Sequence, residues 1–105
     1  MAFSEISVDE LAELMAAGSR LVDVREDDEY ADGHVPGAVH VPLATVADNV
    51  DQFRGEGPTY VICKSGGRSM RACEFLSDRG VEVVNVAGGT MAWQLSGRDV
   101  ETVDS

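Results

Sequence analysis

The 105-residue sequence predicts an α/β fold with a mostly parallel central sheet flanked by helices on both faces. Short, mostly apolar segments of strand length alternate with segments of helical periodicity. The strand segments are apolar almost throughout, as expected where both faces of a sheet are covered, and parallel strands need crossover helices to connect them. The length suits one domain, so we expect a single domain over residues 1–105, with a core of about 5–97 and a short acidic tail at 98–105.

The first half of the chain contains two predicted helices and two predicted strands. Ser7 and Glu10 form a capping-box pattern, and apolar residues follow at helical spacing until Gly18, which predicts the first helix. The next predicted elements are a strand at 21–24, a brief acidic helix at 26–32, a Pro- and Gly-containing turn at 34–38, and a strand at 39–41.

The second half repeats this alternation. Apolar residues at spacings of three and four predict a helix over 43–53. A strand at 59–62, a loop at 63–67, a helix at 69–79, a valine-rich strand at 81–86 and a last helix through Trp93 and Leu95 follow.

The composition excludes several classes of protein. The formal net charge is −11, so we expect no binding to nucleic acid or to an anionic membrane, both of which need broad basic surfaces. No apolar run approaches the ~20 residues that span a bilayer. Residues 1–10 lack the basic and apolar regions of a secretory signal, so we expect a cytoplasmic protein.

The two cysteines are expected to be free thiols. Cytoplasmic proteins rarely keep disulfides, and the spacing of Cys63 and Cys73 matches no zinc pattern. His34 and His40 do not complete such a pattern, so we expect no metal site.

The sequence around Cys63 predicts a reactive site. A buried strand ends there and a helix begins near Ser69, and sites in parallel sheets form at the carboxyl ends of strands. The adjacent glycines Gly66 and Gly67 allow the loop to curl so that its N–H groups point inward, and the helix N-terminus adds positive potential. Both effects stabilise a thiolate, so we expect Cys63 to be a nucleophile at neutral pH.

The same segment is locally basic. Lys64, Arg68 and Arg71 lie in a stretch without Asp or Glu, where cations offset the repulsion between a thiolate and an anionic substrate. A cysteine at a strand end is often only a packing residue, but the glycines, cations and following helix favour function for Cys63. Cys73 shares a helical face with Ala72 and is expected in the core.

These motifs resemble the rhodanese family in order and spacing, from about Leu21 to Trp93. The landmarks are Leu21-Val22-Asp23-Val24-Arg25 with Glu29-Tyr30, Gly33-His34-Val35-Pro36-Gly37-Ala38, Cys63 to Ser69, and Gly88-Gly89 with Ala92-Trp93. The resemblance implies a single rhodanese-like domain that acts as a sulfurtransferase.

The resemblance also implies a mechanism. Cys63 would take sulfane sulfur from thiosulfate or a related anionic donor as a persulfide, and pass it to cyanide in vitro or to a thiol or sulfur-carrier protein in cells. No metal or organic cofactor is required. The substrate-binding loop and persulfide cradle would comprise Lys64, Ser65, Gly66, Gly67, Arg68 and Ser69, with Lys64 and Arg68 as the substrate-binding cations.

Two alternatives remain open. The chain could be an interaction module that delivers or senses sulfur for a protein partner without rapid turnover. The same superfamily contains phosphatases and arsenate reductases, but their loop between Cys and Arg is one residue longer than the stretch 64–67 here, which favours sulfur chemistry. The physiological donor, the acceptor and the oligomeric state are not predicted by the sequence.

Four polar residues near the first strand are assigned structural rather than acid–base roles. These are Asp23, Arg25, Glu29 and His34. We expect Arg25 and Glu29 to form an ion pair between the strand and its helix, and His34 to make a hydrogen bond in a turn.

Overall fold

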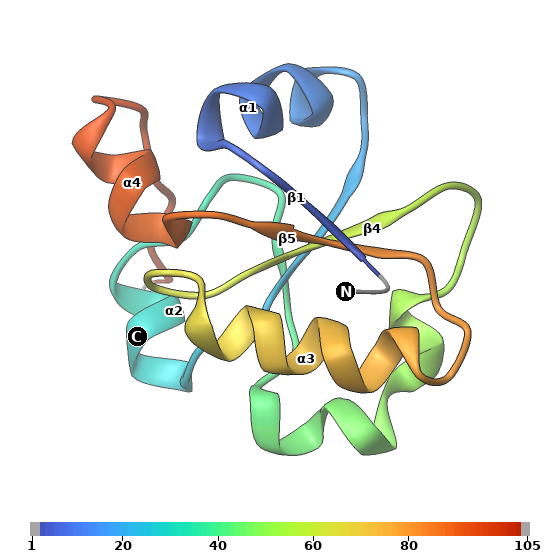
Figure 1. Ribbon diagram of the computed structural model, residues 1–105. Coiled ribbons are helices and arrows are strands. Elements are labelled where there is room, and N and C mark those ends of the chain that lie inside the picture. The colour runs from blue at the N-terminus through green and yellow to red at the C-terminus, as the bar shows by residue number, and fades with distance from the viewer. Residues whose placement is uncertain (1–2, 104–105) are drawn as a thin grey trace.

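A parallel five-stranded sheet forms the centre of the computed structural model, which describes residues 3–103 (Figure 1). Its strands are β1 (Ser4–Ile6), β2 (Arg20–Asp23), β3 (Val39–His40), β4 (Thr59–Ile62) and β5 (Val83–Val86). They lie in the order β1-β5-β4-β2-β3, and every pair is parallel. The central strand is therefore β4, the strand that leads into Cys63.

Helices cover both faces of this sheet, as the sequence predicts. The α-helices are α1 (Val8–Ala16), α2 (Asp27–Asp32), α3 (Gly67–Ser77) and α4 (Gly89–Leu95), and the 3-10 helices are η1 (Leu43–Asp48) and η2 (Val50–Phe53). In Figure 1, α3 and the two 3-10 helices lie on one side of the sheet, and α1 lies on the other. The predicted α/β class is confirmed.

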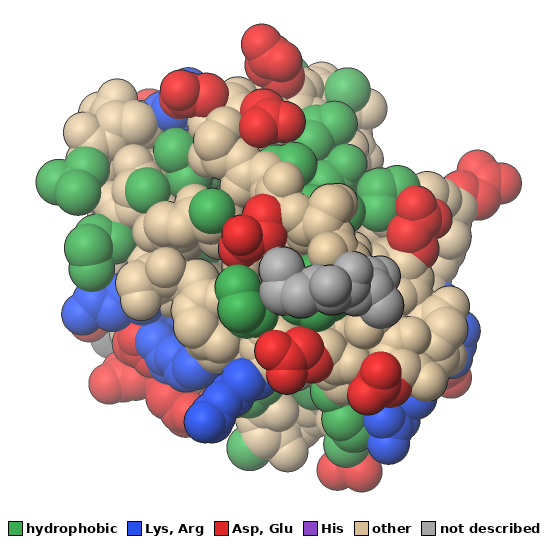
Figure 2. Space-filling view, viewed as in Figure 1, with side chains coloured by type: hydrophobic (Ala, Val, Ile, Leu, Met, Phe, Trp, Pro, Cys, Tyr) green, Lys and Arg blue, Asp and Glu red, His purple; other side chains and the backbone are tan. Residues whose placement is uncertain are grey.

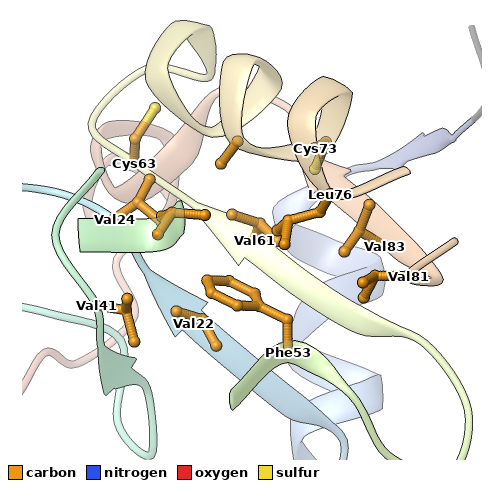
Figure 3. Close-up of a cluster of buried hydrophobic side chains, with 12 residues drawn as sticks. Val22, Val24, Val41, Phe53, Val61, Cys63, Cys73, Leu76, Val81 and Val83 are labelled. Carbon is orange, nitrogen blue, oxygen red and sulfur yellow. The ribbon is translucent and has the colours of Figure 1, made fainter. Parts of the chain in front are cut away.

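Two hydrophobic clusters form the core, one on each face. The first joins β-strand valines to Phe53 of η2 and Leu76 of α3, and it contains both cysteines (Figure 3). The second joins Leu11 of α1 and Trp93 of α4 to the other face of the strands. Because side chains alternate along a strand, each central strand supplies both clusters, which explains its nearly continuous apolar sequence.

The predicted helix over 43–53 is wrong in type. The segment forms η1 and η2, which are separated at Asn49. The side-chain amide of Asn49 donates to the carbonyl of Thr45 at 2.8 Å, at the spacing where an α-helix would use a backbone N–H. This local hydrogen bond competes with the α-helical pattern, although the apolar residues still face the core.

The other elements agree with the prediction apart from their ends and one omission. The strand at 59–62 has the predicted bounds, whereas α3 begins two residues earlier than Ser69 and β5 begins at Val83 rather than Val81. The edge strand β1 was not predicted. Ser7 caps α1 through the expected capping box with Glu10.

The segment after α4 packs against α4 itself and against the turn that follows α2. The indole N–H of Trp93 donates to the carbonyl of Asp99 at 2.8 Å, and the backbones of His34 and Glu101 exchange two hydrogen bonds of 2.9 Å. Between residues 3 and 103, no helix is long and apolar enough to cross a membrane.

Candidate active site

The loop that follows β4 surrounds the sulfur atom of Cys63. The backbone N–H of Gly66 donates to Sγ at 3.1 Å, and the hydroxyl of Ser69 donates to Sγ at 3.2 Å. Gly66 has a φ of 112°, a left-handed conformation that favours glycine because other residues have a Cβ. The loop conformation that turns the Gly66 N–H toward the sulfur therefore depends on this glycine.

Hydrogen bonding distinguishes Cys63 from Cys73, whereas exposure does not. The two residues are 1% and 0% exposed. Burial by itself raises the pKa of Cys63, but hydrogen bonds from the Ser69 side chain and from the backbone of Ser69, Gly66 and Ser65 together lower that pKa below its usual value. No such donor to Cys73 is found among residues 3–103, and burial raises its pKa to about 12. The site therefore favours a thiolate at Cys63, and Cys73 lies in the core as predicted.

The start of α4 holds the first part of this loop. The backbone N–H groups of Thr90 and Met91 donate to the carbonyls of Cys63 and Lys64, each at 2.9 Å. A Cβ on Gly89 would lie 2.5 Å from both of these carbonyl oxygens. Only glycine allows this approach of α4 to the loop, which gives the Gly88-Gly89 motif a physical role beyond its turn.

Arg68 is held by a carboxylate of α2. Its guanidinium donates to the two carboxylate oxygens of Glu29 at 2.6 and 2.8 Å, a bidentate arrangement. The hydrogen bond from Arg68 lowers the pKa of Glu29 to about 2. Arg68 therefore lies at the loop as predicted, but its charge is already balanced.

The predicted ion pair between Arg25 and Glu29 is wrong. Arg25 instead contacts the carboxylate of Asp23 at 2.8 Å, and both side chains are buried. Side chains four residues apart face each other when both lie on one helix, but α2 begins at Asp27, after Arg25. Arg25 also donates to the carbonyl of Gly33 at 2.8 Å, which connects the end of β2 to the end of α2.

Lys64 is exposed and lies beside a pocket of about 220 Å³. Residues of α2 and α4 form the other walls of this pocket. Cys63 is not part of the lining, but Lys64 and Thr90 connect the pocket to the loop. Figure 2 shows several Lys and Arg side chains at the lower left of the view, where Figure 1 has the start of α3. The local positive charge expected from the sequence lies at this surface.

His34 makes the expected turn hydrogen bond. Its Nδ1 lies 2.8 Å from the carbonyl of Tyr30, and its ring stacks on the Tyr30 ring at 3.7 Å between centroids. His40 stacks on Tyr30 with a centroid distance of 4.4 Å. Among residues 3–103, no group of three or more His, Cys, Asp or Glu residues could hold a metal ion.

The sequence did not single out several residues around the loop. Thr90 and Met91 hold the loop through backbone contacts, and Asp32 and Gln94 line the pocket. The Gly88-Gly89 pair was the one available signal for α4. Asp32 and Gln94 belong to no motif of the sequence, and they meet in the pocket from two helices that are distant in sequence.

We predict that the rate at which iodoacetamide alkylates Cys63 rises with pH, with a midpoint below the usual pKa of a thiol. In a Cys73→Ser background, Ser69→Ala is expected to move this profile to higher pH, because the thiolate loses its side-chain donor. Ser77→Ala on the same helix is the matched control, since that hydroxyl donates to Glu74 and not to the cysteine. Coincident profiles for the Ser69 and Ser77 variants would contradict this role of Ser69.

Comparisons with known proteins agree with the fold. The rhodanese-like domain family matches residues 7–96. The Bacillus subtilis protein YtwF is 40% identical over 96 residues, covering 90% of this chain and 93% of that protein. The thiosulfate sulfurtransferase GlpE of Pseudomonas entomophila is 34% identical over 93 residues, covering 88% of this chain and 85% of that protein.

Solved structures show the same similarity. A rhodanese-related protein from Thermoplasma volcanium superposes with a TM-score of 0.87 at 30% identity, covering 94% of this chain and 98% of that one. The family match spans four of the five strands, from β2 to β5, together with the Cys63 loop and α4. This chain belongs to the rhodanese-like domain family.

Proposed function

We propose that this chain is a thiosulfate or related sulfurtransferase that carries sulfur as a persulfide on Cys63. The observation that carries this proposal is the environment of Sγ, which accepts hydrogen bonds from Gly66 N–H and the Ser69 hydroxyl at the carboxyl end of the central strand. Similarity to the GlpE thiosulfate sulfurtransferases supports thiosulfate as the donor.

The first half-reaction is a displacement at sulfur. The Cys63 thiolate attacks the outer sulfur of thiosulfate, a new S–S bond forms, and the old S–S bond breaks with its electron pair leaving on sulfite. The loop amides and the Ser69 hydroxyl cradle the resulting persulfide, through residues 64–69. Because thiosulfate is a dianion, Lys64 reduces the repulsion that it meets at the thiolate.

The role of Arg68 follows from its partner. Glu29 balances its charge and fixes the guanidinium at the loop, so we assign to Arg68 a positioning effect on the loop and to Lys64 the larger part in attracting the donor. In the second half-reaction an acceptor nucleophile attacks the outer persulfide sulfur. The Cys63–sulfur bond then breaks, and its electron pair regenerates the thiolate.

The experiment is an intact-mass measurement of the reduced protein after brief incubation with thiosulfate. We expect one added sulfur atom, located on the peptide that contains Cys63 and removed by cyanide. Release of sulfite in equal amount would establish the stoichiometry. A folded protein that gains no sulfur from thiosulfate would overturn the assignment of this donor.

A further inference from the structure

The pocket beside the loop contains more charged groups than a site for a simple anion needs. Four of its lining residues are ionisable, namely Arg25, Glu29, Asp32 and Lys64. Two are arginine or lysine and two are carboxylates, so the lining is not uniformly positive. A charged group that already forms an ion pair within the protein attracts a ligand less, so the ion pairs of these four residues decide which charges a ligand meets.

Two of these four charges are already balanced inside the protein. Arg25 is paired with Asp23 at 2.8 Å, and Glu29 is paired with Arg68 at 2.6 Å. Asp32 and Lys64 differ from them, because among residues 3–103 neither has an oppositely charged group within 4.0 Å. A ligand in the pocket therefore meets one free carboxylate and one free ammonium group.

These two charges come from different elements of the fold. Lys64 directly follows Cys63, so it is the lining residue that the reactive loop contributes. Asp32 is the last residue of α2 and belongs to another wall. To the same lining α4 supplies Met91, which is 42% exposed and can contact a short aliphatic group, and the amide of Gln94.

Thiosulfate does not use this arrangement well. It carries two negative charges and no positive one, so the free carboxylate of Asp32 opposes its binding. The pocket thus suits the acceptor of the second half-reaction better than the donor of the first. A group that matches it carries an ammonium for Asp32 and a carboxylate for Lys64.

We propose that the acceptor is a small zwitterionic amino-acid thiol, of the chemical class of cysteine, and that Asp32 is the specificity-determining residue that binds its ammonium group. Lys64 binds its carboxylate, which directs the thiol toward Cys63. The acceptor thiol loses its proton to solvent, and its thiolate attacks the outer persulfide sulfur. The acceptor leaves as a persulfide, and Cys63 returns as the thiolate.

This inference rests on the proposed function, and the two are tested separately. Sulfur loading of Cys63 from thiosulfate is first measured by intact mass. Loaded protein is then mixed with cysteine, N-acetylcysteine, which lacks the ammonium, or cysteamine, which lacks the carboxylate. Ratios of kcat/KM between thiols are compared among variants, so that the intrinsic reactivity of each thiol cancels.

Asp32→Asn is expected to lower the preference for cysteine over N-acetylcysteine by about two- to fivefold, the effect of one partly exposed charge. Asp32→Lys should lower it further. Lys64→Met should instead lower the preference for cysteine over cysteamine. Asp78→Asn, which removes an exposed carboxylate from the far end of α3, is the matched control and should change neither ratio.

The outcomes are distinguishable. If the parent protein takes up no sulfur, the proposed function fails before the acceptor is tested. If Cys63 is loaded but both Asp32 variants keep the parent's preference for cysteine over N-acetylcysteine, the assignment of Asp32 is overturned. Equal effects of the Asp32 and Asp78 variants would also overturn it, because they would reflect only the net charge.

Discussion

Cys63→Ser is expected to abolish sulfur uptake from thiosulfate while leaving the protein folded. A serine hydroxyl stays protonated at neutral pH and forms no persulfide, so the first half-reaction has no nucleophile. The replacement is small, and its oxygen can accept the hydrogen bonds that Gly66 and Ser69 donate to Sγ. Intact mass after incubation with thiosulfate should show no added sulfur, and the rate of sulfite release should fall to background.

Cys73→Ser is the matched control for this experiment. Cys73 lies in the same hydrophobic cluster, but no donor stabilises its thiolate and its pKa is raised to about 12 (Figure 3). Its variant should keep sulfur uptake, with some loss of stability because a hydroxyl replaces a buried thiol. Uptake that required Cys73 instead of Cys63 would contradict the assignment of the nucleophile.

The position of the Cys63 loop between a strand and a helix could be predicted from the sequence because its determinants are local. The apolar strand Thr59–Ile62, the following cysteine, the two glycines and the start of α3 are contiguous. Strand and helix ends orient the loop, and Gly66 adopts the left-handed conformation that directs its N–H to Sγ. Cys63 and both donors to its sulfur lie within residues 63–69, although α4 also holds the loop through Thr90 and Met91.

The charges around the loop could not be paired from the sequence. Arg68 and Glu29 are 39 residues apart, and they meet because β2 and β4 are neighbouring strands whose carboxyl ends lie together. The nearer spacing of Arg25 and Glu29 favoured the wrong pair. In physical terms, long-range ion pairs depend on strand order, and strand order is not encoded in local periodicity.

Secondary structure also could not be predicted from local sequence in two elements. The strand Ser4–Ile6 is short and only partly buried, and it exists because it pairs with β5, about 80 residues away in sequence. In the segment 43–53 the apolar spacing suits both an α-helix and a pair of 3-10 turns. The Asn49 side chain decides between them, through a hydrogen bond that periodicity does not reveal.

Arg25→Met is expected to cause the largest loss of stability, about 3–5 kcal/mol in the free energy of unfolding. Arg25 is 5% exposed and Asp23 is 0% exposed, so the variant would leave a buried carboxylate without its counter-charge. The remaining donor to Asp23 is the backbone N–H of residue 25, at 3.0 Å. Urea denaturation should show a lower midpoint with a similar m-value.

The comparison with Arg54→Met separates this effect from a general loss of arginine. Arg54 pairs with Asp51 at the surface, where water already solvates both groups, so its variant should unfold close to the parent. Arg25 also joins the end of β2 to Gly33, next to α2, which carries the Glu29 partner of Arg68. The Arg25 variant should therefore also transfer sulfur more slowly under conditions where it is still folded. If the Arg25 and Arg54 variants unfold at the same urea concentration, the buried pair does not stabilise the fold in the way its geometry predicts.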